Sequence, residues 1–353
     1  MEPVRIAIVG CGVIGKIHAQ CCVKADNITL QAVCDVNKQQ ADKLGKEHAA
    51  NKIYNDLDDV LNDDQVEGVI LALPANLRAK LAVRVLKAGK HLLTEKPVAR
   101  YEAQVQQLID NRGDLTVAVC SSRYRSFAFL EKIRDFIAAG NLGQLRVVHI
   151  RGIIQDSGPR DSDPPIWRVS HKLNGGGIFV NWGCYDLDYM LGLLSWNIKP
   201  KTVLAQTWQC APQLPMRVHE TSDAETHALA LIQCDEGMVI QIERAEFAAI
   251  KGETTWQIIG SKGSLRLQMT HFHDGPTEIF FDKINPDSKL TTQTLFSQNV
   301  DEGDAHDGPP VDFANAIRTG STPRTSLENG LLMQKITDAV YLSAKEQRAV
   351  VIG

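Results

Sequence analysis

A glycine-rich turn between an apolar run and a helical stretch constrains this chain more than any other feature. Residues 4–9 form the apolar run, and Gly10, Gly12 and Gly15 follow it at the spacing GxGxxG. A strand before this spacing and a helix after it predict a dinucleotide site. Gly10 permits the tight turn, Gly12 lets the backbone approach a pyrophosphate, and Gly15 lets the helix pack closely on the strand.

The helix start and the next strand complete the predicted cofactor site. The amide groups of Val13 and Ile14 are expected to face phosphates at the positive end of the helix. Asp35 ends the second apolar run, where a carboxylate accepts hydrogen bonds from both ribose hydroxyls and repels a 2′-phosphate. NAD is therefore favoured, and Asn37 and Lys38 leave NADP open. A merely structural turn, and an Asp35 that only caps the following helix, are the alternatives.

The pattern of apolar runs changes near residue 121. Before it, short runs alternate with helical stretches, which indicates a doubly wound parallel sheet. After it, longer runs of alternating polarity indicate an α+β domain with a mostly antiparallel sheet. An α/β chain with a Rossmann domain over residues 1–121 and a substrate-binding and oligomerisation domain over residues 122–353 is predicted.

The individual elements follow from the same periodicities. Strands are expected at 4–9, 30–34, 68–73, 91–94, 116–121, 145–153, 202–209, 228–234, 238–245 and 255–260. Helices are expected at 15–25, 38–48, 57–62, 78–88, 103–111, 127–139, 184–194, 310–318 and 326–344. A tight hairpin turn is expected at 235–237, and loops are expected at 158–165 and 299–310.

Composition excludes several classes of function. A net charge of −4 without long basic runs argues against a nucleic-acid partner. No uninterrupted apolar span reaches about 18 residues, and no charged region followed by a cleavable apolar stretch opens the chain, so a cytoplasmic protein without membrane attachment is expected. The eight cysteines form no CxxC pair, which predicts buried free thiols and no metal site.

A second motif, Glu95-Lys96-Pro97, follows the fourth expected strand. Together with Leu73-Pro74, Trp167-Arg168, the triple glycine 175–177 and the stretch 338–344, it resembles the Gfo/Idh/MocA oxidoreductases along essentially the whole chain. The resemblance implies a C-terminal domain whose large open sheet builds homodimers or homotetramers. It also implies hydride transfer between a nicotinamide and a hydroxyl-bearing carbon of a sugar, cyclitol or related polyol. Cofactor contacts are implied for Leu73, Pro74, Glu95, Lys96, Trp167 and Arg168.

Lys96 matches the catalytic lysine of that family, and Pro97 is expected to follow it through a cis bond. An ammonium beside the reacting oxygen stabilises developing alkoxide charge. Ligands bind at the carboxyl ends of strands in such sheets, which favours this role over a solvated surface lysine.

Asn181 and Tyr185 stand where the family usually has Asp and His, four residues apart on one face of a helix start. Tyrosine has an unperturbed pKa near 10. One ammonium about 4 Å away, at an effective dielectric near 20, contributes about 4 kcal/mol, or roughly three pKa units before desolvation. Lys96 is thus expected to help Tyr185 transfer the proton, while Asn181 orients the substrate. A core tyrosine is the alternative.

Other positions bear on the substrate. Arg123 and Arg168 are expected to bind it beside Lys96, Asn181 and Tyr185. An interdomain ion pair for Arg123 and a surface position for Arg168 stay open. Ala75 and Arg78 replace a polar residue and a His of the family pattern on the nicotinamide side. The presence of Asn181 and Tyr185 in place of Asp and His also leaves open an inactive dinucleotide-binding regulatory or scaffold protein. A further alternative is an enzyme that retains NAD and couples two sugars.

Overall fold

The computed structural model describes residues 2–155, 163–270 and 275–353, so residues 158–162 of the first expected loop lie outside the described part. The chain forms two compact units. The first comprises Met1–Ser126 and Gly303–Gln334, and the second comprises Phe127–Glu302 and Lys335–Gly353. The expected boundary at residue 121 therefore placed residues 303–334 in the wrong unit.

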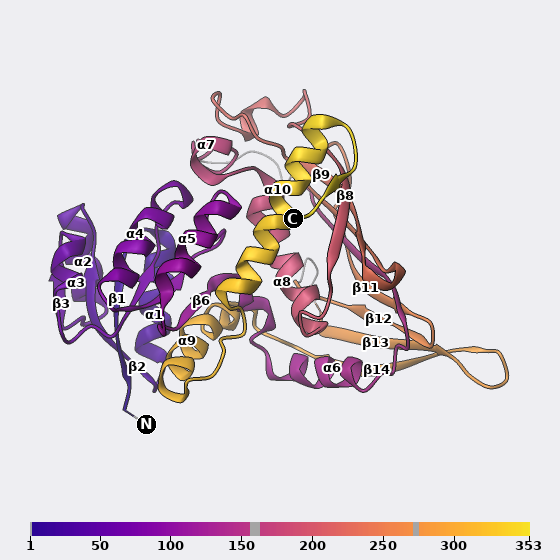
Figure 1. Ribbon diagram of the computed structural model, residues 1–353, viewed down its shortest axis with the longest axis horizontal. Helices are drawn as coiled ribbons and strands as arrows, with labels where there is room; N and C mark the ends of the chain where they lie inside the picture. Colours follow the sequence, from indigo (N-terminus) through magenta and orange to yellow (C-terminus); the bar gives the residue numbers. More distant parts are fainter. Residues whose placement is uncertain (1, 156–162, 271–274) are drawn as a thin grey trace. The chain divides into compact units, whose positions relative to one another are not determined.

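The first unit is built on a six-stranded parallel sheet in the order β3-β2-β1-β4-β5-β6, which confirms the expected Rossmann architecture. Figure 1 labels β1, β2, β3 and β6 of this sheet. Its strands are β1 Val4–Val9, β2 Ile28–Cys34, β3 Lys52–Tyr54, β4 Gly68–Leu71, β5 His91–Thr94 and β6 Val117–Val119. Its helices are α1 Val13–Lys24, α2 Lys38–Glu47, α3 Leu57–Leu61, α4 Ala75–Lys87, α5 Glu102–Arg112 and α9 Gly308–Thr319. The sequence pattern missed β3, since three partly exposed residues at a sheet edge carry little periodicity.

Helix α9 explains why the end of the chain belongs to the first unit. Phe313 and Ala314 of this helix are fully buried in the core cluster that contains Ile6 and Ile8 of β1. A Cβ on Gly68 of β4 would lie 3.1 Å from the Phe313 ring, so the helix lies directly on the sheet. The expected loop over 299–310 was partly wrong, because η5 spans Glu302–His306 and α9 begins at Gly308.

The second unit is built on a nine-stranded sheet in the order β14-β13-β12-β11-β7-β10-β9-β8-β15. All neighbours pair antiparallel except β7 with β10, as expected for a mostly antiparallel sheet. The strands are β7 Leu145–Ile154, β8 Pro200–Trp208, β9 His227–Cys234, β10 Val239–Glu246, β11 Glu253–Gly260, β12 Gly263–Leu267, β13 Thr277–Ile284, β14 Leu290–Gln298 and β15 Val350–Val351. The expected turn at 235–237 joins β9 to β10.

The helices of the second unit include α6 Ala128–Ala138, α7 His171–Asn174 and α8 Cys184–Leu193. Helix α10, Leu327–Glu346, contributes residues to both units. The helix expected from residue 184 starts earlier, because a π-helical turn at Phe179–Gly183 runs directly into α8. The site residues therefore lie on a helix with an inserted residue, and not at the start of a regular α-helix.

A buried ion pair fastens α8 to the sheet. Arg244 in β10 and Asp186 in α8 are both fully buried, with their side chains joined by bonds of 2.5 and 2.7 Å. Trp256 in β11 donates its indole N–H to Asp186 at 2.8 Å. A Cβ on Gly152 would lie 2.3 Å from the guanidinium of Arg244, so the glycine in β7 makes room for the buried arginine.

All eight cysteines are free thiols, and every one except Cys210 is buried, as expected. Among the described helices, none combines the length and the apolar character that a bilayer span requires.

Candidate active site

The glycine turn has the geometry of a phosphate-binding loop. Gly10 has φ +102°, and a Cβ there would lie 2.4 Å from the Ala72 oxygen. A Cβ on Gly15 would lie 1.9 Å from the Gly10 oxygen, whereas one on Gly12 meets nothing within 4 Å. The first turn of α1, which begins at Val13, has no side-chain cap, so its N–H groups suit an anionic pyrophosphate. These residues fit the dinucleotide that the sequence predicted.

The three glycines predict different consequences of added methyl groups. We expect Gly12→Ala to fold normally, because its φ of −73° suits alanine, and to bind NAD about tenfold more weakly. Gly15→Ala is expected to lower the free energy of unfolding by about 1–3 kcal/mol through overpacking. Urea unfolding and NADH fluorescence titration measure the two effects. Equal effects of both substitutions on folding would contradict this assignment.

Asp35 is held by main-chain donors on both sides. Its Oδ2 accepts the Cys11 N–H and its Oδ1 accepts the Asn37 N–H, both at 2.8 Å. Asn37, and not Asp35, caps α2 through the N–H groups of Gln39 and Gln40. The capping alternative for Asp35 is therefore wrong, and its partly exposed carboxylate retains lone pairs for ribose hydroxyls.

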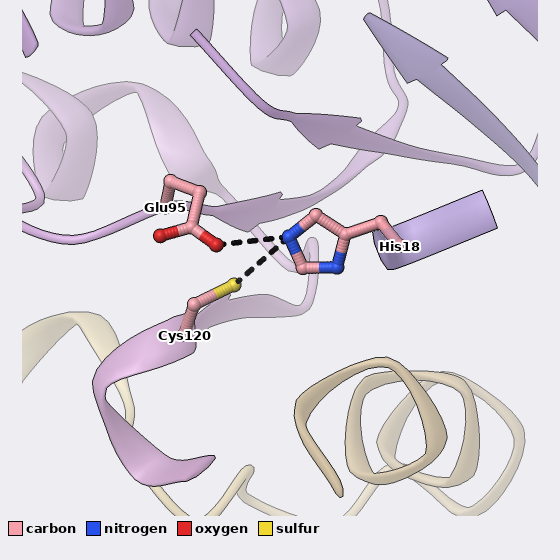
Figure 2. Close-up of side chains that lie close together, drawn as sticks. All are labelled: His18, Glu95 and Cys120. Atoms are coloured by element: carbon pink, nitrogen blue, oxygen red, sulfur yellow. Dashed lines mark hydrogen bonds and ion pairs between the residues drawn. The ribbon is translucent and has the colours of Figure 1, made fainter. Parts of the chain in front are cut away.

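Glu95 connects α1 to the lysine turn after β5. Figure 2 shows its carboxylate and the Cys120 thiol converging on one nitrogen of His18: the Glu95 Oε1 lies 2.9 Å from Nε2 and the Cys120 Sγ lies 3.9 Å from it. The other carboxylate oxygen accepts the Lys96 N–H at 3.0 Å. Burial opposes ionisation of Glu95, but the His18 hydrogen bond and the nearby cationic groups hold its pKa well below the usual range.

Within the described ranges, the same three side chains are the group whose ligand atoms lie close enough to hold a metal, all within 4.8 Å. The His18 nitrogen that faces the cluster already shares a hydrogen bond with Glu95. Burial also raises the pKa of the Cys120 thiol well above its ordinary value, which disfavours the thiolate that a soft metal binds. We assign the cluster as a hydrogen-bonded support for the lysine turn.

The Lys96–Pro97 peptide bond is cis, as the family resemblance implied. Lys96 is partly exposed at the carboxyl end of β5. Arg78, which is buried in α4, donates to the Leu73 oxygen at 2.7 Å and to the Pro97 oxygen. It thus ties the Leu73-Pro74 turn to the lysine turn. The sequence singled out Arg78 only as a departure from the family pattern, and it did not predict the supporting role of His18.

Arg123 lies in the turn after β6 and contacts residues of its own unit. Its guanidinium lies 3.1 Å from the Nε2 of His306 and donates to the Tyr124 hydroxyl at 3.0 Å. The neighbouring Arg125 donates to the Arg324 oxygen at 2.7 Å, also within the first unit.

Burial and then the charge of Arg123 lower the pKa of His306 from 6.5 to about 4. Between these values the unfolded chain binds a proton that the folded chain does not, so stability falls as the pH falls from 6.5 to 4. We expect His306→Asn to remove roughly 1 kcal/mol of this pH dependence, after allowance for solvent screening of a half-buried group. Urea unfolding at pH 7 and pH 5 measures it. Identical pH dependence in both proteins would refute the prediction.

In the second unit, Asn181 lies within the π-helical turn and Tyr185 lies in the first turn of α8. Both are buried, with exposed fractions of 9% and 3%. The Trp182 ring packs edge-on against the Tyr185 ring at a centroid distance of 5.7 Å. π-Helical turns are rare in proteins, and those that occur are frequently found at functional sites. The predicted pair is thus carried on one short helical segment.

Trp167 and Arg168 lie in a turn before α7. Arg168 pairs with the carboxylate of Glu246, which is almost fully buried, and lies over the Phe247 ring at 5.7 Å. Trp167 is 44% exposed. Arg168 is not a free surface residue, because its guanidinium pairs with Glu246 at the end of β10.

The fold and the glycine loop define an NAD-binding oxidoreductase. Residues 4–119 match the family model described as an oxidoreductase family with an NAD-binding Rossmann fold. Residues 130–266 match the model of the GFO/IDH/MocA C-terminal domain. The chain belongs to the Gfo/Idh/MocA family of oxidoreductases, which confirms the resemblance seen in the sequence and the expectation of NAD.

Curated relatives align along almost the whole chain. Myo-inositol 2-dehydrogenase of Thermotoga maritima is 23% identical over 359 residues, covering 98% of both chains. D-glucoside 3-dehydrogenase of Escherichia coli is 23% identical over 356 residues, covering 98% of this chain and 96% of the relative.

Solved structures share the fold. An oxidoreductase domain protein from Kribbella flavida has a TM-score of 0.85 at 21% identity and covers 100% of both chains. Levoglucosan dehydrogenase in complex with NADH and levoglucosan also has a TM-score of 0.85, at 19% identity, covering 99% of this chain and 100% of that one. At such low identity these likenesses establish the architecture.

Proposed function

We propose that this protein is an NAD-dependent dehydrogenase that acts on a hydroxyl-bearing carbon of a sugar, cyclitol or related polyol. The observation that carries the proposal is Lys96 at the carboxyl end of β5, with its main chain held by Glu95, in a unit whose glycine loop fits a dinucleotide. The named relatives act on inositol and a glucoside, which supports this substrate class.

Three side chains carry the proposed chemistry. Bound NAD supplies the hydride acceptor, or its reduced form supplies the donor. Lys96 stabilises the negative charge that develops on the reacting oxygen. Tyr185 accepts or donates the hydroxyl proton, and Asn181 orients the substrate by donating and accepting hydrogen bonds. Arg123 and Arg168 bind the substrate, and Trp167 contacts the cofactor. Arg168 is anchored by Glu246.

A screen of polyols with NAD and NADP, followed at the absorbance of the reduced nicotinamide, tests the activity. We expect turnover with NAD on at least one cyclic polyol. Tyr185→Phe is expected to lower kcat by about 10²-fold or more, because phenylalanine cannot transfer a proton. Binding of NAD without turnover on any polyol would instead support the inactive scaffold.

Assembly of copies through the large sheet is part of the proposal. Leu204, Trp208 and Leu231 of β8 and β9 are 52%, 44% and 45% exposed. A homodimer or homotetramer that buries this apolar face is expected. Light scattering coupled to gel filtration measures the mass, and Leu204→Glu with Leu231→Glu is expected to shift it toward the monomer. A monomeric wild type at micromolar concentration would exclude this assembly.

We further propose a cytoplasmic location. The eight free thiols, seven of them buried, suit a reducing compartment, in which disulfides rarely persist. Fluorescence microscopy of a tagged chain in its host tests the location.

A further inference from the structure

The helical segment that carries Tyr185 begins after a run of three glycines. The side chain of one acidic residue, Glu225, accepts hydrogen bonds from the N–H groups at its start. Glu225 accepts the Gly177 N–H with Oε2 at 3.0 Å and the Phe179 N–H with Oε1 at 2.9 Å. Its main-chain oxygen accepts the intervening Ile178 N–H at 3.0 Å. One residue therefore satisfies three successive donors of the kind that helix starts leave without intrahelical partners.

Tyr341 in α10 holds the same carboxylate. Its hydroxyl donates to Oε1 of Glu225 at 2.9 Å and accepts the Gly177 N–H at 3.3 Å. Its ring packs edge-on against His171 at a centroid distance of 5.1 Å. Glu225 is 4% exposed, and a buried carboxylate requires such hydrogen bonds to be stable. We call Glu225 and Tyr341 the N-terminal clamp.

The clamp explains two of the three glycines. A Cβ on Gly176 would lie 1.9 Å from the Tyr341 hydroxyl. A Cβ on Gly177 would lie 1.7 Å from the main-chain oxygen of Glu225. Neither position can carry a side chain while the clamp residues approach this closely. The triple glycine and the tyrosine near the chain end, two separate elements of the family resemblance, thus form one structural unit.

The clamp ends where the π-helical turn begins. Phe179 is the last residue that Glu225 holds and the first residue of the turn. A π-helical turn inserts one residue and so changes the direction of the side chains that follow. We propose that Glu225, held by Tyr341, is a positioning residue that sets the register of this turn and thereby the directions of Asn181 and Tyr185. The inference rests on the proposed function, in which both side chains act on the substrate.

Two substitutions in the full-length protein test the clamp. Glu225→Gln keeps the side-chain size but retains only one acceptor oxygen, and Tyr341→Phe removes only the hydroxyl. We expect Glu225→Gln to lower kcat per folded molecule at least about tenfold, because small misplacements of reacting groups slow catalysis strongly. Tyr341→Phe is expected to lower kcat less. The KM for NAD is expected to stay within about twofold, because the glycine loop is unchanged.

Glu243→Gln is the matched control. Glu243 is a partly buried carboxylate of the same unit that bonds Arg151 at 2.8 Å and His227 at 2.9 Å. Its loss is expected to reduce the melting temperature without lowering kcat per folded molecule. The clamp inference is overturned if Glu225→Gln and Tyr341→Phe both keep wild-type kcat, or lose activity only in proportion to folded protein. In that case the proposed function is still supported if the wild type turns over a polyol and Lys96→Met abolishes this turnover.

Discussion

A Lys96→Met variant is expected to lose about 10²- to 10⁴-fold in kcat, the range that an electrostatic stabiliser and proton-transfer partner supplies. Methionine keeps much of the side-chain length and removes the charge. The hydrogen bond from the Lys96 N–H to Glu95 and the hydrogen bond from Arg78 to the Pro97 oxygen do not involve the ammonium, so the turn is expected to persist.

Steady-state kinetics on the polyol found by the screen measure the loss, and NADH titration shows whether the cofactor still binds. Lys87→Met is the control, since Lys87 is an exposed lysine at the end of α4 in the same unit. Retention of more than about a tenth of the wild-type kcat in Lys96→Met would remove the lysine from the mechanism, because that loss is smaller than such groups normally supply.

Arg244→Met is expected to lower the free energy of unfolding by about 3–5 kcal/mol, because it leaves the carboxylate of Asp186 buried without its countercharge. Among the described residues, the Trp256 indole N–H then remains as a donor to Asp186. The double variant Arg244→Met/Asp186→Leu is expected to be more stable than the single variant, since no isolated charge stays buried. Asp186 directly follows Tyr185, so turnover is expected to fall as well.

Urea unfolding measures these differences. The exposed pair of Arg266 with Asp282, at 2.8 Å, provides the control. Arg266→Met is expected to change stability by no more than about 1 kcal/mol. If Arg244→Met lowers the free energy of unfolding as little as the control does, solvent reaches the buried pair and other contacts fasten α8 to the sheet.

The parallel unit was largely predictable because its signals are local. The first two apolar runs, the glycine turn and Asp35 lie within the first 35 residues and have fixed spacing. Strands β12, β13 and β14 were missed. In β14 the reason is that most residues are exposed and carry little hydrophobic alternation. The segment 303–334 was assigned to the wrong unit because its partners lie some 300 residues earlier in the chain.

The candidate site was predictable to the extent that it consists of motifs. Lys96 and Glu95 were proposed as site residues through the Glu-Lys-Pro element, and Asn181 and Tyr185 through their distance from the triple glycine. The π-helical turn could not be predicted from the sequence, because its inserted residue depends on Glu225, which lies 46 residues after Phe179. Long-range hydrogen bonds of this kind leave no periodic signal in the sequence.

The return of α9 to the first unit affects how the protein can be synthesised and dissected. A ribosome completes the parallel sheet long before it makes Phe313, so the apolar surface around Ile6 and Ile8 stays open while nearly 200 further residues emerge. A fragment ending at residue 126 is expected to aggregate during expression for the same reason. A cofactor-binding fragment for biophysical work therefore requires residues 303–334 to be spliced onto the first 126 through a designed linker.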